Sequence, residues 1–426
     1  RPGEKTRQQP PRGGVREAHR RLFSAGFLTA RRMAASRNTD RPADTRADTP
    51  ADGAVPGGFG LYVHWPFCVS KCPYCDFNSH VADTVDPDAW QRNLLAELDH
   101  YGTKTKGRRL DSVFFGGGTP SLMPPEITAA LLDRLAVYWT LSPDLEITLE
   151  ANPSSVEAQK FNDFRAAGVN RVSVGIQSFD DAALKFLGRA HSASEALEAI
   201  SIAERVFERV SFDLIYALPG QTREAWTAEL AAALARGYGH LSLYQLTIEK
   251  GTPFYAAHRN GAFDLPDDDL AADLYEITAD MTSKSGLPAY EVSNLVYWRG
   301  GDYVGIGPGA HGRLTLAQGC IRTEQVPSPA GWLAAVAADG HATRVAADIP
   351  AAERADELLM MGLRLTDGID RALYERIIGM PLDDSLDGDR VAALSAAGLV
   401  VSDRRGLRAT PAGMQRLNAV IAAISV

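Results

Sequence analysis

The segment FGLYVHWPFCVSKCPYC, residues 59–75, joins a short apolar run to three closely spaced cysteines. Residues 59–65 are apolar on at least one face, which predicts a strand of a covered sheet. Cys68, Cys72 and Cys75 follow and can supply three thiolates to one iron–sulfur cluster. A four-iron cluster held by three thiolates keeps one iron free to bind a small molecule.

Structural zinc is the alternative occupant of these cysteines. A closed zinc site needs four ligands and commonly takes them from two paired half-sites. The sequence has no second cysteine pair: Cys320 lies far away and alone, and His64 and His80 would make irregular fourth ligands. The spacing therefore favours an iron–sulfur cluster.

From residue 59 to residue 250, short β-prone runs alternate with helical patterns. We expect strands at 59–65, 111–115, 145–150, 170–176, 210–216 and 240–247, and helices at 87–103, 124–139, 155–167, 192–207 and 222–236. Six such units predict an α/β fold, a partial (β/α)6 barrel of the TIM-like type. The cysteines follow the first strand, at the end of the barrel where chemistry gathers.

We expect four parts along the chain. Residues 1–58 form a disordered leader, 59–250 the partial barrel, 251–345 an extension of the barrel, and 346–426 a smaller C-terminal domain. The extension should contain a helix at 268–286 and then a glycine-rich, irregular stretch at 290–313.

The C-terminal part has a different pattern. A helix is expected at 350–365 and another at 388–397, followed by two short strands and a last helix from Pro411. This order resembles a small winged-helix-like unit of the α+β type. It carries no basic face, which favours a packing role over nucleic-acid binding.

The leader differs from the rest in composition. It is rich in arginine up to Arg32 and then turns to a mixture of Ala, Asp, Thr and Pro that cannot bury a core. The basic stretch at 20–32 is compatible with a transit peptide, and Met33 is an alternative start. We therefore expect a cytoplasmic protein, or a mitochondrial one if the leader is a transit peptide.

Charge and hydropathy restrict the partners. The net charge of −9 gives no footprint for nucleic acid. No apolar run approaches the roughly 20 residues of a spanning helix, so any membrane association would be peripheral. Four cysteines, three of them clustered, favour a reducing compartment over a disulfide framework. Small molecules or another protein are the expected partners, and no oligomeric state is assigned.

Polar residues follow the next strands. Gly116, Gly117 and Gly118 come directly before Thr119 and would let backbone groups approach a cofactor, although three glycines alone are also typical of a turn. Glu150 ends the third strand and could neutralise an ammonium group or accept from a ribose. A helix-capping acid is the alternative for Glu150.

Three further polar residues belong to the fourth and fifth units. Gln177 ends the fourth strand, Arg189 lies in the following loop, and Asp213 lies within the apolar fifth strand. A buried carboxylate normally keeps a partner, so Asp213 should meet Arg189 or a ligand. A purely structural Asp–Arg pair is the alternative.

Together these residues resemble the radical S-adenosylmethionine (SAM) superfamily and, within it, the oxygen-independent coproporphyrinogen III oxidase-like family, from about Phe59 to the end. The resemblance implies that the cysteines hold a [4Fe–4S] cluster whose fourth iron binds SAM. It implies SAM contacts for Tyr62, Gly117 and Glu150, a matching aromatic residue in Tyr74, and a second SAM pocket at Gly118, Thr119, Gln177, Arg189 and Asp213.

Two branches of the family differ after the third cysteine. The oxidases carry a fourth cysteine there, whereas this chain has DFNS at 76–79. That run, YEVSN at 290–294 and GIGPGAH at 305–311 resemble the HemW haem-chaperone branch. The resemblance implies that the chain binds haem and passes it to an acceptor protein. The glycines at 305–309 lack the helix and spaced acid of a dinucleotide loop.

One stretch departs from this branch. HemW proteins usually carry His-Asn-x-x-Tyr-Trp, and the corresponding residues here are SNLVYW, 293–298, without the histidine. Tyr297 and Trp298 are the haem candidates that the resemblance leaves, with Cys320 or His311 as substitute ligands. Packing is the alternative role for Tyr297 and Trp298.

Three functions stay open at this point. The first is a haem chaperone, the second an oxidase that decarboxylates coproporphyrinogen III, and the third another radical SAM enzyme. The missing fourth cysteine favours the first. No catalytic residue is assigned.

Overall fold

The computed structural model describes residues 27–31, 54–82, 84–237, 239–289 and 295–424. The expected transit segment at 20–32 and the start at Met33 therefore lie mostly outside the described residues, as does the YEVSN run. None of the helices in these ranges is long and apolar enough to cross a membrane.

Six parallel strands form a curved sheet in chain order. They are β2 (Phe59–Trp65), β5 (Arg109–Gly117), β6 (Thr140–Ala151), β7 (Arg171–Gln177), β8 (Arg209–Tyr216) and β9 (His240–Gln245). Among the described strands β9 and β2 lie at opposite ends of this six-stranded run and do not pair, so the barrel is open. The expected partial (β/α)6 barrel is thereby confirmed.

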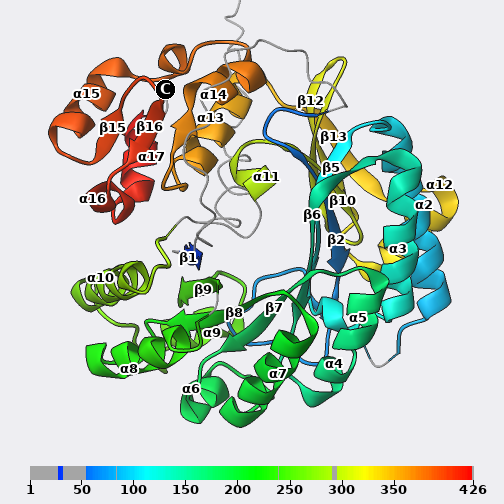
Figure 1. Cartoon of the computed structure of the whole chain (residues 1–426), viewed down its shortest axis with the longest axis horizontal. Coiled ribbons are helices and arrows are strands. Elements are labelled where there is room, and N and C mark those ends of the chain that lie inside the picture. Colours follow the sequence, from blue (N-terminus) through cyan, green and yellow to red (C-terminus); the bar gives the residue numbers. More distant parts are fainter. Residues whose placement is uncertain (1–26, 32–53, 83, 238, 290–294, 425–426) are drawn as a thin grey trace, which may run out of the picture.

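Helices cover the outer face of this sheet (Figure 1). They are α2 (Pro87–Lys104), α3 (Pro125–Tyr138), α4 (Ser155–Gln159), α5 (Phe161–Ala167), α6 (Asp181–Phe186), α7 (Ala193–Val206) and α8 (Arg223–Leu234). The single helix expected at 155–167 is two helices, separated at Lys160. The short helix α6 was not expected.

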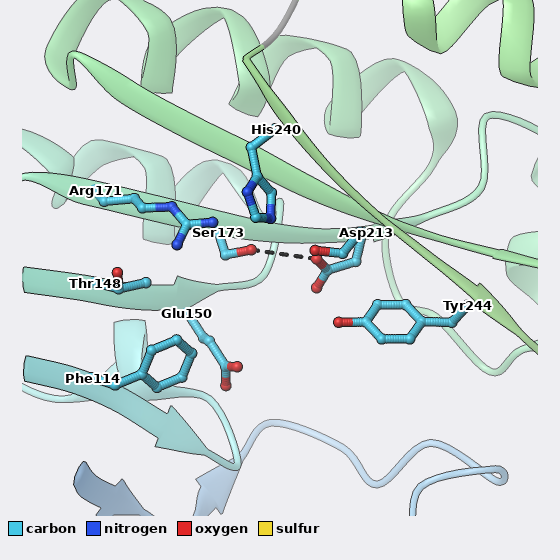
Figure 2. Close-up of a pocket in the computed structure, with 9 residues that line it drawn as sticks. Phe114, Thr148, Glu150, Arg171, Ser173, Asp213, His240 and Tyr244 are labelled. Carbon is cyan, nitrogen blue, oxygen red and sulfur yellow. Dashed lines mark hydrogen bonds between the residues drawn. The ribbon is translucent and has the colours of Figure 1, made fainter. Parts of the chain in front are cut away.

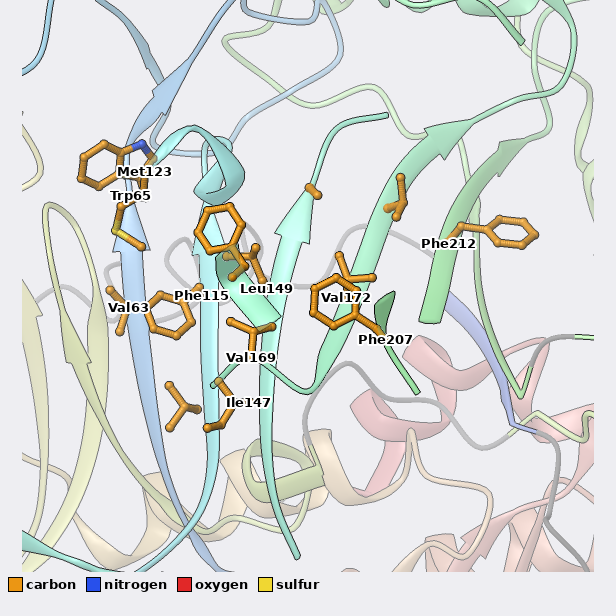
Figure 3. Close-up of a cluster of buried hydrophobic side chains, with 14 of the residues drawn as sticks. Val63, Trp65, Phe115, Met123, Ile147, Leu149, Val169, Val172, Phe207 and Phe212 are labelled. Atoms are coloured by element: carbon orange, nitrogen blue, oxygen red, sulfur yellow. The ribbon is translucent and has the colours of Figure 1, made fainter. Parts of the chain in front are cut away.

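The main core lies between the sheet and these helices. Val63, Phe115, Leu149, Val172 and Phe212 come from five neighbouring strands, lie side by side in Figure 3 and are fully buried. Each such side chain contributes roughly 1.5–3 kcal/mol relative to exposure. The alternate residues point to the inside of the barrel.

That inner face is polar. Glu150 pairs in register with Ser173, Ser173 with Ser211, and Asp213 with Ser242. In a closed TIM barrel the corresponding layers are packed with branched apolar side chains. The polar inner face therefore leaves a place for a polar ligand.

The extension continues the sheet beyond β2. Strand β10 (Asp302–Ile306) is parallel to β2, and β11 (His311–Leu316), β12 (Gly319–Gln325) and β13 (Thr343–Asp348) follow antiparallel. The irregular stretch expected at 290–313 is therefore wrong for 302–306 and 311–313. A Cβ at Gly305 would lie 2.0 Å from the carbonyl oxygen of His311, so glycine here permits close strand pairing.

The expected disordered leader is wrong for one segment. Strand β1 (Phe27–Arg31) pairs antiparallel with β9, the edge strand of the barrel. An unpaired strand edge offers backbone donors and acceptors to any extended segment, which a composition argument cannot detect. Residues 54–58 are also described and lead into β2.

The C-terminal part is a separate small unit. After α13 (Ala351–Gly362) come β14 (Ile369–Asp370), α14 (Arg371–Ile378), α15 (Gly388–Ala396), β15 (Val400–Ser402), β16 (Gly406–Ala409), α16 (Pro411–Met414) and α17 (Leu417–Ile424). The strands form a sheet in the order β14-β16-β15, with a hydrophobic cluster of their own. The expected winged-helix-like α+β unit is confirmed.

The remaining elements connect these parts. They are β3 (Phe67–Cys68), β4 (His80–Val81), the 3-10 helices η1 (Pro120–Leu122) and η2 (Leu382–Ser385), α9 (Pro253–Arg259), α10 (Asp268–Lys284), α11 (Leu295–Trp298) and α12 (Pro329–Asp339).

Candidate functional site

The three clustered cysteines lie on one loop at the carboxyl end of β2. The short strands β3 and β4 pair and close this loop at its base, with the His80 N–H donating to the Pro66 carbonyl at 2.7 Å. Within the loop the Cys75 N–H donates to the Cys72 carbonyl at 3.2 Å. All three thiols are free and half-buried. Their expected position after the first strand is confirmed.

Hydrogen-bond donors surround the thiols. The Thr119 hydroxyl donates to Sγ of Cys68 at 3.4 Å, and Nη1 of Arg189 donates to Sγ of Cys72 at 3.5 Å. Burial raises the pKa of Cys68, and the Thr119 hydrogen bond acts against that rise. Burial also raises the pKa of Cys75, countered by the Phe77 backbone N–H. Donors of this kind favour the thiolate form that binds iron.

The donor set fits an iron–sulfur cluster. In the described ranges, no three His, Cys, Asp or Glu side chains converge closely enough to hold one metal ion. A four-iron cluster makes no such demand, because each thiolate binds a different iron. Three thiols on one loop, each with a hydrogen-bond donor beside it, match that arrangement.

The glycines after β5 pack against the end of β2. Gly117 has a φ of +117°, and a Cβ there would lie 2.6 Å from the His64 ring. A Cβ at Gly118 would lie 2.7 Å from the Phe67 carbonyl oxygen. Gly117 thus needs glycine because of its positive φ and the adjacent His64 ring, and Gly118 because of the close backbone of Phe67. The sequence prediction of a cofactor seat included neither role.

His64 was missed as a rim residue, and it orients Tyr62. Its Nε2 lies 2.9 Å from the Asn78 carbonyl oxygen, so this nitrogen carries the proton. Its Nδ1 then accepts from the Tyr62 hydroxyl at 3.0 Å. Burial lowers the pKa of His64 to about 4, so the ring is neutral at physiological pH. Burial, together with Glu150, raises the pKa of Tyr62.

Asn152 is a second residue that the sequence prediction missed. Its Nδ2 donates to the Thr119 hydroxyl at 2.9 Å, and its Oδ1 accepts from Nη2 of Arg189 at 2.7 Å. A chain of hydrogen bonds therefore runs from Cys68 through Thr119, Asn152 and Arg189 to Cys72. The only sequence signal was its place directly after the third strand, before a proline.

Gln177 and Arg189 lie together over Gly175. Gln177 has a φ of +74°, which is unusual for a residue other than glycine, and its Oε1 is buried without a hydrogen-bond partner among the described residues. Arg189 also donates to the Gly175 carbonyl at 2.8 Å. Strained backbone of this kind clusters at functional sites. Tyr74 lies near Arg189 and packs against Phe254.

A pocket opens on the polar inside of the barrel (Figure 2). It is lined by Phe114, Thr148, Glu150, Arg171, Ser173, Asp213, His240, Ser242 and Tyr244. Figure 2 places Glu150 and Asp213 on facing sides, with the Ser173 hydroxyl donating to Oδ1 of Asp213 at 3.3 Å. The structure thus brings the two predicted carboxylates into one pocket.

The two carboxyl groups influence each other. Burial raises the pKa of Glu150 to about 8, with a further contribution from Asp213. Burial raises the pKa of Asp213 to about 6, against hydrogen bonds from Ser242 and Ser173. A cation in the pocket would favour ionisation of both groups. The alternative of a direct Asp213–Arg189 pair is not supported, because the hydrogen bonds of Arg189 go to Asn152, Gly175 and Cys72.

Tyr297 and Trp298 lie away from the cysteine loop. They belong to α11, which precedes β10, and the Asp302 N–H donates to the Gly58 carbonyl at 3.0 Å. This places them at the amino end of β2, whereas the cysteines follow its carboxyl end. The seven residues of β2 span about 20 Å. The structure therefore does not bring the haem candidates and the cysteines together.

The two substitute haem ligands, Cys320 and His311, lie toward opposite ends of β2. Tyr297 packs edge-on against Tyr303, with ring centroids 4.3 Å apart, and Tyr303 is close enough to Cys320 for the thiol to affect its pKa. His311 instead influences His64, at the carboxyl end of β2. Only Cys320 therefore lies on the side of Tyr297.

Two family models match the chain. Residues 62–231 match the Radical SAM superfamily and residues 349–416 match the HemN C-terminal domain. The solved structure of coproporphyrinogen III oxidase (HemN) from Escherichia coli has a TM-score of 0.72 at 22% identity, covering 87% of this chain and 90% of that one. The fold is therefore that of HemN.

Sequence similarity to two other proteins narrows the family to which the chain can belong. The chain is 38% identical over 421 residues to radical S-adenosyl methionine domain-containing protein 1, mitochondrial, from Bos taurus, covering 94% of each protein. It is 39% identical over 347 residues to the heme chaperone HemW of Escherichia coli, covering 76% of this chain and 89% of that protein.

A cysteine loop at the first strand of an open, six-stranded parallel barrel defines a radical SAM protein. Within that superfamily the chain belongs to the oxygen-independent coproporphyrinogen III oxidase-like family, in its HemW branch. Membership implies a [4Fe–4S] cluster and SAM as cofactors.

Proposed function

We propose that this chain is a haem chaperone that carries a [4Fe–4S] cluster and SAM, binds haem and transfers it to an acceptor protein. The observation that carries the proposal is the cysteine loop with its ring of donors, in a chain 39% identical to a protein named heme chaperone HemW. The acceptor protein is not identified.

Cys68, Cys72 and Cys75 would hold the cluster, which supplies a reducible centre with one open iron when bound. Tyr62, Gly117 and Glu150 would contact SAM at that iron, and Tyr74 would lie beside it. SAM carries a sulfonium and an ammonium group, and the pocket offers the carboxyl group of Glu150 to these positive charges. Gly118, Thr119, Gln177, Arg189 and Asp213 form the proposed second SAM position.

Haem would bind at Tyr297 and Trp298. These two aromatic residues are partly buried, and the lost histidine leaves Cys320, near Tyr303, as the thiol ligand on that side. A haem at this place would be separated from the cluster by the length of β2. Electron transfer and haem binding would then be distinct events on one scaffold.

One anaerobic experiment tests the proposal. The cluster is reconstituted in the full chain, haem is titrated and followed by absorbance, and the loaded protein is mixed with an apo-haem protein. We expect one haem per chain, weakened by replacing Trp298 with alanine, and transfer to the apo-protein. Haem that does not bind, or that binds and does not transfer, would overturn the chaperone proposal.

Coproporphyrinogen III oxidation is the second candidate, and the HemN-like fold favours it. Against it, Phe77 stands where the resemblance places the fourth cysteine of the oxidases. The same loaded protein is incubated with coproporphyrinogen III, SAM and a reductant. Decarboxylated product would establish the oxidase, and its absence together with haem transfer would support the chaperone.

The cellular location belongs to the same proposal. A cytoplasmic location was the first expectation, but the relative named as mitochondrial aligns over 94% of this chain, more than residues 59–426 alone can supply. This supports the mitochondrial alternative. A fusion of residues 1–58 to a fluorescent protein should enter mitochondria if the basic leader is a transit peptide. A diffuse signal would instead support a cytoplasmic location.

A further inference from the structure

The turn after β7 holds Gln177 in an unusual conformation. Gln177 has a φ of +74°, in the left-handed region that residues with a Cβ rarely adopt. A Cβ at Gly175 would lie 3.0 Å from its Nε2, and its Oε1 is buried without a hydrogen-bond partner among the described residues. Both features are unfavourable in the ligand-free chain, because such backbone is strained and a buried acceptor has lost its contact with water. The surrounding residues must therefore hold Gln177 in place.

Side chains of the following loop hold the backbone before Gln177. The pairing of β7 with β8 shifts register there, so the regular ladder is interrupted. The Gly175 carbonyl accepts from Nη2 of Arg189 at 2.8 Å, and the Ile176 carbonyl lies 3.0 Å from Nε2 of His191. Because a carbonyl can only accept, this His191 nitrogen carries the proton. The two residues before Gln177 are thus fixed from one side.

Glu229 holds the backbone after Gln177. One oxygen of this carboxyl group, Oε1, accepts from the Ser178 hydroxyl at 2.6 Å and from the Phe179 N–H at 2.7 Å. Ser178 is fully buried, and its hydroxyl oxygen also accepts from the Asp180 N–H at 3.0 Å. Burial raises the pKa of Glu229, and its two donors act against that rise. A carboxylate oxygen is a strong acceptor, so these bonds fix the turn from the other side.

Glu229 reaches this turn from outside the barrel. It belongs to α8, and Trp226, one turn earlier on that helix, stacks on Tyr216 with ring centroids 4.7 Å apart. Side chains alternate along a strand, and Asp213 of β8 lines the interior pocket, so Tyr216 faces outward. Figure 1 likewise shows α8 on the outer face of the sheet. Glu229 can therefore influence a ligand inside the barrel only through the turn at Gln177.

We propose that Glu229 is a positioning residue for SAM: it fixes the backbone after Gln177 and thereby aims the unpaired amide oxygen at a donor group of SAM. An amide oxygen accepts hydrogen bonds from amino and hydroxyl groups, and SAM carries both on its adenine and ribose. A contact that is ordered before the ligand arrives binds more tightly, because less conformational freedom is lost on binding. This role rests on the proposed SAM position at Gln177.

The test is a double-mutant cycle on SAM affinity, measured by anaerobic isothermal titration of the cluster-loaded full chain. Gln177→Ala identifies the SAM position that this side chain serves, since the affinity of that position should fall. Glu229→Ala leaves Ser178 and Phe179 without their acceptor and should weaken the same position about threefold to tenfold. The double variant should bind no more weakly than Gln177→Ala, because Glu229 acts only through Gln177.

Three further variants separate positioning from other effects. Glu229→Gln keeps one oxygen that can accept from both donors, so it should retain most of the SAM affinity. Ser178→Ala removes one of the two hydrogen bonds and should also weaken SAM binding, which tests the role of Glu229 even if Glu229→Ala does not fold. Glu224→Ala is the matched control, because Glu224 is an exposed acid in the first turn of α8. Its SAM affinity should equal that of the unaltered chain.

Three results would overturn the inference while leaving the proposed SAM position intact. They are unchanged SAM affinity in Glu229→Ala or Ser178→Ala, a loss in Glu229→Gln as large as that in Glu229→Ala, and full additivity of the two losses in the double variant. If instead Gln177→Ala binds SAM as tightly as the unaltered chain, the proposed SAM position at Gln177 is wrong, and the role of Glu229 is wrong with it.

Discussion

At the scale of single residues, Asn152 joins two parts of the rim that lie on different loops. One end of its amide accepts from Arg189 and the other donates to Thr119. Both partners in turn donate to cysteine sulfurs. Asn152 therefore sets the orientation of two residues of the proposed SAM pocket without being a member of it.

Replacing Asn152 with alanine should weaken SAM binding to the loaded chain about tenfold or more. The guanidinium of Arg189 would lose a hydrogen bond of the charged type, which contributes roughly 1.5–3 kcal/mol. Isothermal titration with SAM measures the change. Asn152→Asp keeps the oxygen that accepts from Arg189 and should lose less affinity than Asn152→Ala. Equal affinity for Asn152→Ala and the parent would contradict this role.

Glu150 should make the stability of the ligand-free chain depend on pH. Its folded-state pKa of about 8 lies above the ordinary value of 4.5, so the folded chain binds more protons than the unfolded chain between these values. Stability contributed by this group is therefore lost as the pH rises through about 8. We expect Glu150→Gln to raise the melting temperature at pH 9, and to change it little at pH 4.5.

Glu204→Gln is the control for this measurement, because Glu204 is an exposed acid on α7. The melting temperature of the Glu204→Gln variant should equal that of the parent at both pH values. A Glu150→Gln difference that is the same at pH 4.5 and pH 9 would show that burial does not raise the pKa of Glu150.

At the scale of elements, the pairing of β10 with β11 depends on glycine. A Cβ at Gly305 would lie 2.0 Å from the His311 carbonyl oxygen, a separation that requires the strands to move apart. Strand β10 also pairs with β2, which carries the cysteine loop. Glycine at position 305 therefore affects β2 and its cysteine loop as well as the pairing of β10 with β11.

Gly305→Ala should destabilise the protein by about 1–3 kcal/mol or more, the range for overpacking a tight site. Denaturant unfolding of the ligand-free chain measures the loss. Gly388→Ala serves as the control, since a Cβ at Gly388 would meet nothing within 4 Å. If both variants unfold at the same denaturant concentration, the pairing of β10 with β11 does not require glycine at position 305.

A second element-scale feature links α2 to the extension. Glu97 is fully buried and accepts from the Gly307 N–H at 2.8 Å, the Ala342 N–H at 2.8 Å and the Trp332 indole at 2.9 Å. Burial raises its pKa to about 7. One helix side chain thus satisfies three donors from segments far away in the sequence, and it holds the Gly307 turn beside Asn78 and the cysteine loop.

At the scale of the whole molecule, the proposed cluster and haem sites occupy opposite ends of β2. The cysteines follow Trp65, and Tyr297 precedes the strand that pairs with Phe59. The two sites share a scaffold but no described side chain. Loss of one should therefore leave the other able to bind.

Cys72→Ser should abolish the absorbance of the iron–sulfur cluster and leave the haem affinity within about twofold. Anaerobic reconstitution followed by iron analysis and haem titration measures both. Cys320→Ser should keep the cluster, because Cys320 lies near Tyr303 and far from the loop. Parallel loss of haem binding in Cys72→Ser would mean that haem uses the cysteine loop instead.

The local part of the fold was predictable from the sequence. The six barrel strands and most of their helices lie within a few residues of their expected bounds. Buried strands and amphipathic helices each give the sequence a characteristic spacing of hydrophobic residues, which can be read directly. The irregular stretch expected at 290–313 was wrong for 302–306 and 311–313, because the glycines that allow close pairing of β10 with β11 also resemble a loop. The leader was wrong at 27–31 because its partner, β9, lies far along the chain.

By itself the sequence determined that three thiolates would follow the first strand of a parallel barrel, since spacing and periodicity are local properties. The donors that face those thiolates, Thr119 beside Cys68 and Arg189 beside Cys72, follow from the tertiary structure alone. The tertiary structure also decided that Tyr297 lies a full strand away from the cysteines. Hydrogen bonds and distances between remote segments depend on how the chain packs, and no local pattern encodes them.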